Sequence, residues 1–469
     1  MALSIIQRLF SVKSFLHGSQ PLGEIPPAKQ LYTNAVQMAW PSILESFLVA
    51  LVGFIDTIMV SSLGSYAIAA VGLTTQPKFI CLAIFISMNV AVSALVARRR
   101  GEDDRESANR ILMQALIITI ILAAIITTAA VAFADPILKL AGTAPDTHDA
   151  AVTYFRIISA GMIFNVVSLV INAAQRGSGN TKIAMRTNMV SNGVNIIFNY
   201  LLIGGHFGFP KLGVAGAAVA TVIGTVFACG MSIYSICKKD RFLYLRTLKK
   251  IRFDKRTLLS LADLGSSTLA EQIFLRIGFL TYAMIVARLG TNAFAAHQVG
   301  MNIMSISFSF GDGLSVAAVA LVGRSLGQKR TDLAKIYGAI CQRMGFLFSI
   351  LLCIVYTTLS EQIFLLFSED TEILGYGRMI MSMIAVIVFM QITQVIYSGC
   401  LRGGGDTRFV ALVSLVSVAF FRPFCGWLFC YPLGMALTGA WIGLVVDQFC
   451  RLVMTFFRFK SGKWTKHQI

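Results

Sequence analysis

Charged residues are scarce in this chain, and acidic ones are the scarcest. Only 13% of the 469 residues are Asp, Glu, Lys or Arg, which is about half the share found in a soluble globular domain. The hydrophobic share is 56%, and no stretch of about a hundred residues has the composition of a soluble domain. An appended cytosolic catalytic domain is therefore excluded. The chain is predicted to be an all-α integral membrane protein whose function lies inside the bilayer.

Motifs of common enzyme and cofactor sites are also missing. The glycine-rich segments lack the GxxxxGK[ST] spacing of a phosphate-binding loop, and no HExxH motif occurs. The five histidines are scattered and the nine cysteines show no CxxC spacing, so neither a metal site nor a disulfide framework is expected. The basic residues do not gather on a soluble face, which excludes nucleic acid as a partner. We therefore predict a protein that is not an enzyme and that needs no cofactor.

Long apolar runs predict twelve transmembrane helices in two sets of six. The first set lies near residues 36–62, 66–97, 110–134, 150–175, 182–204 and 213–237. The second set lies near residues 258–288, 292–323, 334–358, 374–400, 407–429 and 434–457.

Lys and Arg residues concentrate in the loops of one side. Nine of them lie between Lys238 and Arg256, and most of the others lie in the N-terminus, the remaining even-numbered loops and the C-terminus. Because Lys and Arg near helix ends resist translocation, this side and both termini are predicted to be cytoplasmic. The predicted location is the plasma membrane, which in bacteria is the inner membrane.

An internal repeat relates the two sets of helices at a constant offset of 226 residues. Several separate blocks agree on this single shift, which chance rarely produces. The matched pairs are Leu63-Gly64 with Leu289-Gly290, Arg176-Gly177 with Arg402-Gly403, and Glu45 with Glu271. Because six spans return the chain to its starting side, the halves are predicted to be parallel repeats that enclose a binding cleft.

The predicted organisation has five segments. They are an N-terminal cytoplasmic or interfacial segment, residues 1–35; a six-helix bundle, 36–237; a basic cytoplasmic linker, 238–257; a second six-helix bundle, 258–457; and a cytoplasmic tail, 458–469.

Three features together resemble one transporter family. They are the Asp-Thr-Ile-Met sequence at Asp56–Met59, the paired Arg-Gly-x-Gly-x-Thr segments after helices 4 and 10, and the two six-helix halves. These features resemble the multidrug and toxic compound extrusion (MATE) transporters of the MOP flippase superfamily. Asn195 and Asn199, with Glu271, resemble the NorM branch, whereas the DinF branch typically has an aspartate at the position of Asn199.

Asp56 is the first candidate site residue, because an ionisable side chain within an apolar span costs at least a few kcal/mol. Glu45 lies eleven residues earlier on the same helical face. Two simpler interpretations stay open. Asp56 could cap the extracellular end of its helix near Gly64, and Glu45 could lie at the level of the lipid headgroups.

Asparagines form a polar face on the fifth predicted helix. Asn188, Asn192, Asn195 and Asn199 are spaced by four, three and four residues, which places all four on one side. Such a face could ligate a cation or hold a carboxyl group, or it could simply join helices. On the fourth helix, Asn172 is a second inward polar candidate.

Glu271 on the seventh helix is the candidate for the second half, where Tyr282 occupies the position equivalent to Asp56. The resemblance implies that this glutamate works with an acidic residue on helix 10 in sodium-coupled NorM relatives. The matching stretch here, Gln391 to Gln394, contains no carboxylate, which argues against sodium at that place. A structural ion pair is the alternative role for Glu271.

The remaining charged residues within spans rank lower. Asp312 lies between two glycines, and Arg276 is not on the same helical face as Glu271. Asp447 and Arg451 are spaced by four residues and predict a local salt bridge.

These observations predict a cation-coupled antiporter, driven by H⁺ or Na⁺, that exports amphipathic, often cationic drugs and toxic organic compounds by rocking-bundle alternating access. We expect a monomer in the lipid bilayer, and no bound metal beyond Na⁺ at Asp56, Asn195 and Asn199. The predicted coupling and substrate residues are Asp56, Asn195, Asn199, Glu271, Asn192, Asn172, Tyr282, Gln391 and Gln394, followed by Glu45, Asp312 and Arg276.

A flippase for lipid-linked oligosaccharides is the alternative within the same superfamily. It would need a strongly basic central cavity, and Arg276, Arg343 and Arg422 are the arginines well inside the spans. A membrane-embedded enzyme and a channel are further alternatives, of which the channel would show single-channel currents. The choice between H⁺ and Na⁺ and the natural substrate stay open at this point.

Overall fold

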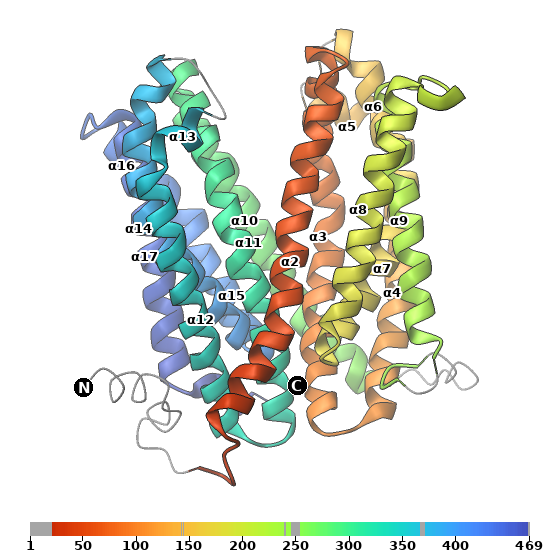
Figure 1. The fold of residues 1–469 in the computed structure, drawn as a ribbon, viewed down its shortest axis with the longest axis vertical. Coiled ribbons are helices and arrows are strands. Elements are labelled where there is room, and N and C mark those ends of the chain that lie inside the picture. Colours follow the sequence, from red (N-terminus) through yellow and green to blue (C-terminus); the bar gives the residue numbers. More distant parts are fainter. Residues whose placement is uncertain are drawn as a thin grey trace. The chain divides into compact units, whose positions relative to one another are not determined.

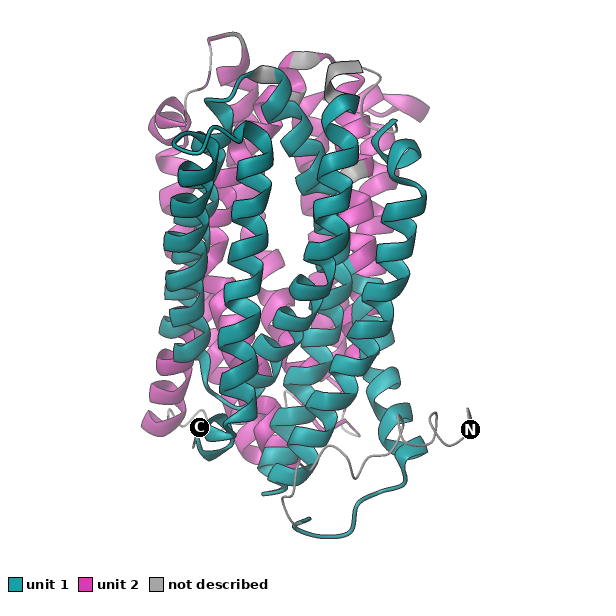
Figure 2. Ribbon diagram, turned by 90° about the vertical axis from the view of Figure 1, so that its left-hand side faces the viewer, with its two compact units in different colours: residues 1–46, 266–469 teal, residues 47–265 magenta. Residues whose placement is uncertain are grey.

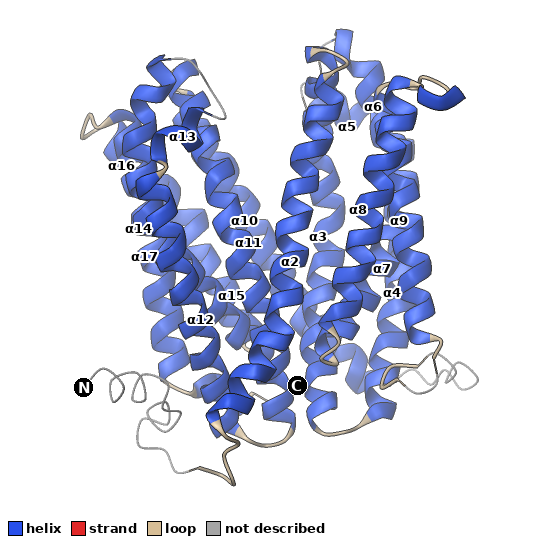
Figure 3. Cartoon of the chain, viewed as in Figure 1, coloured by secondary structure: helices blue, strands red, loops and turns tan. Residues whose placement is uncertain are grey.

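The computed structural model describes residues 21–141, 143, 145–238, 241–244, 254–365 and 371–467. All of the regular secondary structure in these ranges is helical (Figure 3). The first twenty residues of the predicted N-terminal segment, much of the basic linker 238–257 and the last two residues of the tail lie outside the described residues.

Within the described residues, the first repeat has eight α-helices and one short 3₁₀ turn (Figure 1). They are α2 (Ala28–Ser61), α3 (Ser65–Gly101), α4 (Arg105–Ala132), α5 (Ala134–Leu140), α6 (Pro145–Ala160), α7 (Met162–Gly177), α8 (Thr181–Gly204), η2 (His206–Gly208) and α9 (Val214–Ile236).

The second repeat follows a similar order. Its elements are α10 (Lys255–Ala287), α11 (Thr291–Gly327), α12 (Thr331–Thr358), α13 (Ser360–Leu365), α14 (Thr371–Gly403), α15 (Thr407–Ser414), the π-helical segment η4 (Leu415–Phe421), α16 (Arg422–Cys430), α17 (Ala436–Lys460) and the 3₁₀ turn η5 (Lys463–Lys466).

Twelve membrane-crossing segments can be recognised in the described part of the chain, as predicted. Ten helical segments, one of them α15 to α16 taken as a single span, are long and apolar enough to cross a bilayer. The pair α6 and α7, bent by 46° at Gly161, makes an eleventh. The twelfth is α8, whose 24 residues are long enough to span the hydrocarbon but whose asparagines make it more polar. Large side chains on α4, including Ile121 and Ile125, are more than half exposed, as suits a face toward lipid.

The chain forms two compact units (Figure 2). Unit 1 comprises Met1–Ser46 and Ser266–Ile469, and unit 2 comprises Phe47–Gly265. Both boundaries fall inside helices, so α2 and α10 each contribute residues to both units. The predicted bundles 36–237 and 258–457 are instead bounded by loops.

The internal repeat is visible in the helix boundaries. The bounds of α3 and α4 become those of α11 and α12 when 226 is added to each residue number. Gly64 and Gly290, which precede α3 and α11, have φ values of 109° and 111°, a conformation that favours glycine. The repeats differ where α14 is continuous but α6 and α7 are bent, and where η4 interrupts a helix that is continuous in α8.

Each unit also contains the same close approach of a glycine to a neighbouring helix. A Cβ atom on Gly177 of α7 would lie 2.4 Å from the backbone oxygen of Ser93 on α3. In unit 1, a Cβ atom on Gly403 of α14 would lie 2.7 Å from the backbone oxygen of Val319 on α11. These close approaches follow from small residues at helix interfaces, because lipid tails give apolar side chains little reason to associate.

We predict that Gly177→Ala lowers the free energy of unfolding by about 1–3 kcal/mol, because a methyl group would push α7 away from α3. Gly230→Ala is the matched control, because a Cβ atom on this α9 glycine meets nothing within 4 Å. Alanine should be neutral or slightly stabilising there, by up to about 1 kcal/mol. Thermal unfolding of both purified variants in detergent tests the expectation, and equal stabilities would contradict it.

Candidate functional site

A cavity of about 340 Å³ lies within unit 2, between α2, α3, α6, α8 and α9. Its volume is within the range of small-molecule sites. Its lining combines a few polar groups with small and apolar residues. They are Gly53, Asp56, Thr57, Val60, Val71, Gly72, Thr75, Lys78, Tyr154, Asn199, Ala217 and Thr221.

The carboxylate of Asp56, on α2, is held by α8. Asn199 Nδ2 donates a hydrogen bond of 2.6 Å to Asp56 Oδ1. Asn195 lies one turn earlier on the same face of α8, and both asparagines are buried. The asparagine face of α8 therefore meets Asp56.

The Asn195 amide fits its surroundings in one orientation. In that orientation its nitrogen donates a hydrogen bond of 2.9 Å to Asp56 Oδ1. Its oxygen accepts hydrogen bonds of 3.2 Å from the hydroxyl and from the backbone N–H of Thr221. Asp56 Oδ1 then accepts from two amides. Bonds of this kind to a charged acceptor are stronger than those between neutral groups, and they help to offset the cost of a carboxylate inside a membrane span.

Two cavity residues were not predicted from the sequence. Lys78 on α3 and Tyr154 on α6 line the cavity, and both interact electrostatically with Asp56. Lys78 directly follows Pro77, within an otherwise apolar span. The rule that an intramembrane charge needs a functional reason would have identified it.

The other predicted polar residues of unit 2 lie elsewhere. Asn172 on α7 belongs to a buried network with Ser168 and with Ser232 of α9, at distances of 2.9 to 3.3 Å. This network joins two helices, which is the simpler of the two predicted roles for such groups. Asn192 does not line the cavity, and its Nδ2 atom has no hydrogen-bond partner among the described residues.

Glu271 of α10 belongs to unit 1 and forms an ion pair with Arg402 of α14. The glutamate is 3% exposed, and its Oε2 atom has no hydrogen-bond partner among the described residues. Arg402 is the arginine of the second Arg-Gly-x-Gly-x-Thr segment. The pair therefore connects a predicted site residue with the repeated motif.

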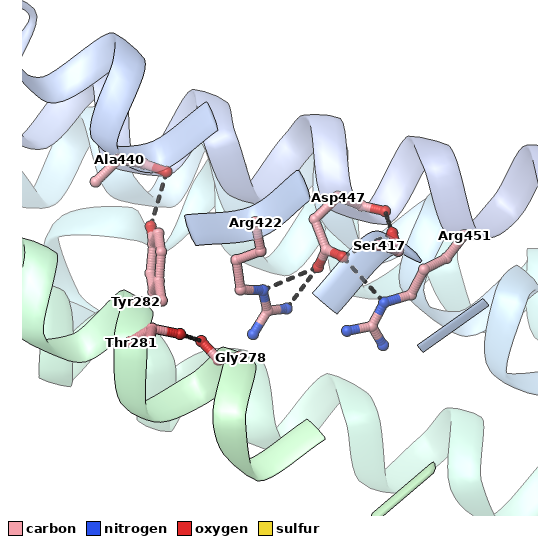
Figure 4. A network of polar contacts seen from close by, with 8 residues as sticks. All are labelled: Gly278, Thr281, Tyr282, Ser417, Arg422, Ala440, Asp447 and Arg451. Carbon is pink, nitrogen blue, oxygen red and sulfur yellow. Dashed lines mark hydrogen bonds and ion pairs between the residues drawn. The ribbon is translucent and has the colours of Figure 1, made fainter. Parts of the chain in front are cut away.

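A second charged network lies deep in unit 1 (Figure 4). Arg422 donates from Nε and Nη2 to Asp447 Oδ2, at 3.0 and 2.6 Å. The predicted salt bridge from Arg451 is confirmed at 3.1 Å, on Asp447 Oδ1, which also accepts from Ser417 at 2.9 Å. Asp447 and Arg422 are almost completely buried. The π-helical segment η4 ends directly before Arg422 and contains Ser417, so it positions two of the four partners.

Tyr282 and the remaining candidates lie in unit 1. Tyr282 is buried and its hydroxyl donates 2.7 Å to the backbone oxygen of Ala440 (Figure 4). Asp312 accepts from Ser46 at 3.4 Å. The others lie on α2, α10 and α14, and they are the buried Glu45, the half-buried Arg276, and the buried Gln391 and Gln394.

Two further observations concern enzyme chemistry. Among the described residues, no group of three or more His, Cys, Asp or Glu side chains could hold a metal ion. Gly323 to Gly327 has the GxSxG spacing of a hydrolase motif, but it lies inside α11, and Ser325 donates to the backbone oxygen of Leu321 at 2.8 Å. A hydrolase nucleophile would instead lie on a strand-to-helix turn.

The MatE family model matches residues 41–201 and 268–428, that is, once in each repeat. The chain belongs to the MatE family. The predicted resemblance is thereby confirmed, and the protein is a NorM-like, multi-pass membrane protein of the transporter class, located in bacteria in the inner membrane.

Curated relatives resemble the chain over most of its length. A probable multidrug resistance protein NorM of Thermotoga maritima is 26% identical over 452 residues, which cover 96% of each chain. The multidrug resistance protein MdtK of Edwardsiella ictaluri is 27% identical over 457 residues, covering 93% of this chain and 96% of the relative.

Solved MatE structures share the fold. A multidrug resistance MATE family transporter in an outward-facing conformation superposes with a TM-score of 0.87 at 21% identity, covering 94% of this chain and all of the other. A MOP superfamily transporter from Pyrococcus furiosus, described as having a binding pocket of reverse polarity, also gives 0.87, at 20% identity, covering 95% of this chain and all of the other.

We predict that Asp447→Asn lowers the free energy of unfolding by about 3–5 kcal/mol, because the variant leaves two arginines without their buried counter-charge. Arg378→Gln is the matched control in the same unit, since it breaks an ion pair with Glu361 in which both side chains are largely exposed. Its expected effect is about 0–1 kcal/mol. Thermal unfolding in detergent measures both, and a similar small effect for the two variants would contradict the prediction.

Proposed function

We propose that this MatE family member is a cation-coupled antiporter that exports amphipathic organic cations and related drugs. The observation that carries the proposal is the Asp56 carboxylate, which is held by two asparagines and lines a cavity inside the membrane span. The names of the relatives support drugs as the exported class.

The geometry suits reversible binding of one positive charge. The two amides engage Oδ1, which leaves Oδ2 of Asp56 for a proton, a metal cation or the ammonium of a drug. A buried carboxylate with fixed N–H donors needs little reorganisation when its counter-charge changes. The same carboxyl group can therefore serve the coupling ion and the substrate in turn.

Antiport follows from this competition. When the coupling ion occupies Asp56, the carboxyl group loses its attraction for a cationic drug, so the drug is released. The coupling free energy is the difference in affinity of the two conformations for ion and drug. In the proposed cycle, the two units alternate access to opposite sides of the membrane, and both termini are cytoplasmic.

Two contacts support placing both described chain ends on one side of the membrane. Gly23 lies against Arg330 and Gly462 lies near Lys335, and both partners are at the start of α12. The positive-inside rule assigns that side to the cytoplasm.

Glu271 is proposed to be a second carboxyl group whose charge changes when it binds a proton. It is buried, one carboxylate oxygen bonds Arg402, and the other has no hydrogen-bond partner among the described residues. Protonation of Glu271 would release the guanidinium of Arg402, which lies in the last turn of α14. The flippase alternative has no comparable support, because Arg422 is enclosed with Asp447 and does not line the cavity described above.

Asp56→Asn is expected to abolish ion-dependent ethidium efflux, because an amide can neither bind a proton nor pair with a drug cation. Efflux by everted membrane vesicles under a pH gradient or a sodium gradient measures this. Asp135→Asn is the control, since Asp135 is a surface carboxylate on α5, and it should retain wild-type transport. Full ion-dependent efflux by Asp56→Asn at equal expression would overturn the proposal.

Gly72→Leu is expected to reduce ethidium efflux by about tenfold or more, because the side chain would occupy the space that the drug needs. A Cβ atom on Gly72 meets nothing within 4 Å and the residue lines the cavity, so the variant should fold normally. Gly230→Leu, also in open space but on no part of the cavity lining, should transport as wild type. Unchanged efflux by a folded Gly72→Leu would place drug binding elsewhere.

A further inference from the structure

The cavity of unit 2 is lined by a basic residue as well as by an acidic one. Of its twelve lining residues, only Asp56 and Lys78 are ordinarily charged. They come from different helices, α2 and α3, and neither forms an ion pair within 4 Å among the described contacts, although they interact electrostatically. The cavity is therefore close to neutral in total, with two separated charges.

Oxygen atoms suited to a hard monovalent cation surround Asp56. The Oδ1 atom of Asn199 is buried and has no hydrogen-bond partner among the described residues. The hydroxyl groups of Thr57 and Tyr154 line the same cavity. Carboxylate, carbonyl and hydroxyl oxygens are the ligands that hard cations prefer. The ligand atoms alone would therefore permit sodium.

The ammonium of Lys78 makes sodium binding at Asp56 less favourable. Sodium is attracted to Asp56 only electrostatically, and a positive charge on the neighbouring helix opposes that attraction inside a low-dielectric span. A proton instead forms a covalent bond to a carboxylate oxygen and needs no further ligand. The same repulsion acts on a proton and on a drug cation, but the proton gains a covalent bond and the drug buries apolar surface in the cavity. Sodium has neither gain, so its affinity is lowered the most.

We propose that Lys78 is the resident cation of the Asp56 site and makes it selective for protons over sodium. This inference rests on the proposed function and names its coupling ion. In the resting site, Lys78 provides the positive charge that sodium provides in a sodium-coupled transporter. Lys78 is a specificity-determining residue that acts through the electrostatics of the cavity, without contact with the carboxylate.

The groups around Asp56 leave few other candidates for this role. Lys78 from α3 and Tyr154 from α6 are the titratable residues that share the lining. Helix α8 contributes the neutral amides of Asn195 and Asn199, and α9 contributes Thr221. Any dependence of transport on pH in this cavity therefore has to be assigned among Asp56, Lys78 and Tyr154.

Ethidium transport by purified protein in proteoliposomes tests the inference, with an imposed pH gradient and, separately, an imposed sodium gradient. Wild type should respond to the pH gradient and be indifferent to sodium. Lys78→Gln should acquire a response to the sodium gradient of about fivefold or more over a matched choline gradient. Lys78→Arg keeps the charge and should stay indifferent to sodium, as should Lys139→Gln, which alters an exposed lysine on α5.

Binding is measured independently by thermal unfolding in sodium chloride and in choline chloride. A ligand that binds only the folded protein raises its melting temperature, so sodium should stabilise Lys78→Gln and not wild type. Lys78→Met is measured alongside it. The inference is overturned if wild type responds to sodium as strongly as to protons, or if folded Lys78→Gln stays indifferent to sodium in both measurements. It is also overturned if neither neutral variant folds, because Lys78 is then a structural residue.

The Asp56→Asn variant separates the two proposals. If it keeps ion-driven transport, the proposed function itself fails, whatever Lys78 does. If Asp56→Asn loses transport while Lys78→Gln shows no response to sodium, only the role of Lys78 is lost.

Discussion

A carboxylate within the apolar span of α2 is the constraint on which the rest of unit 2 depends. Its charge must be compensated inside the membrane, and the compensation comes from two amide donors on α8 and an ammonium on α3. This requirement explains why α8 is more polar than the other membrane spans. It also explains why a cavity with polar walls occurs in an otherwise apolar bundle.

Unit 1 has no carboxylate at the position equivalent to Asp56, and the residues around that position differ as well. The positions equivalent to Asp56, Lys78 and Asn199 hold Tyr282, Met304 and Cys425. The buried acidic residues of unit 1 include Glu271 and Asp447, each paired with arginine. Buried ion pairs of this kind hold a geometry and are costly to break. The two repeats therefore share a backbone plan while distributing their charges in different ways.

The sequence predicted the relations that helical periodicity sets, whereas it carries little signal for contacts between distant helices. The asparagine spacing predicted that Asn195 and Asn199 share one face of their helix, and both amides bond Asp56. The four-residue rule identified Arg451 as a partner of Asp447 but could not identify Arg422, which lies on another helix. Lys78 was not predicted, because its partner Asp56 lies on another helix and no spacing rule connects the two residues. The short helices α5 and α13 lie between spans, where hydropathy carries no signal.

Both covalent connections between the two units run through continuous helix. The boundaries at Ser46 and Gly265 fall inside α2 and α10, so any relative displacement of the units must twist or flex these two rods. Pro41, which cannot donate a helical hydrogen bond, lies one turn or so before the first boundary, and Gly265 lies at the second. Both are residues that soften a helix. Each junction between the units therefore has a helix-weakening residue at or near it, and neither Pro41 nor Gly265 lines the cavity of unit 2.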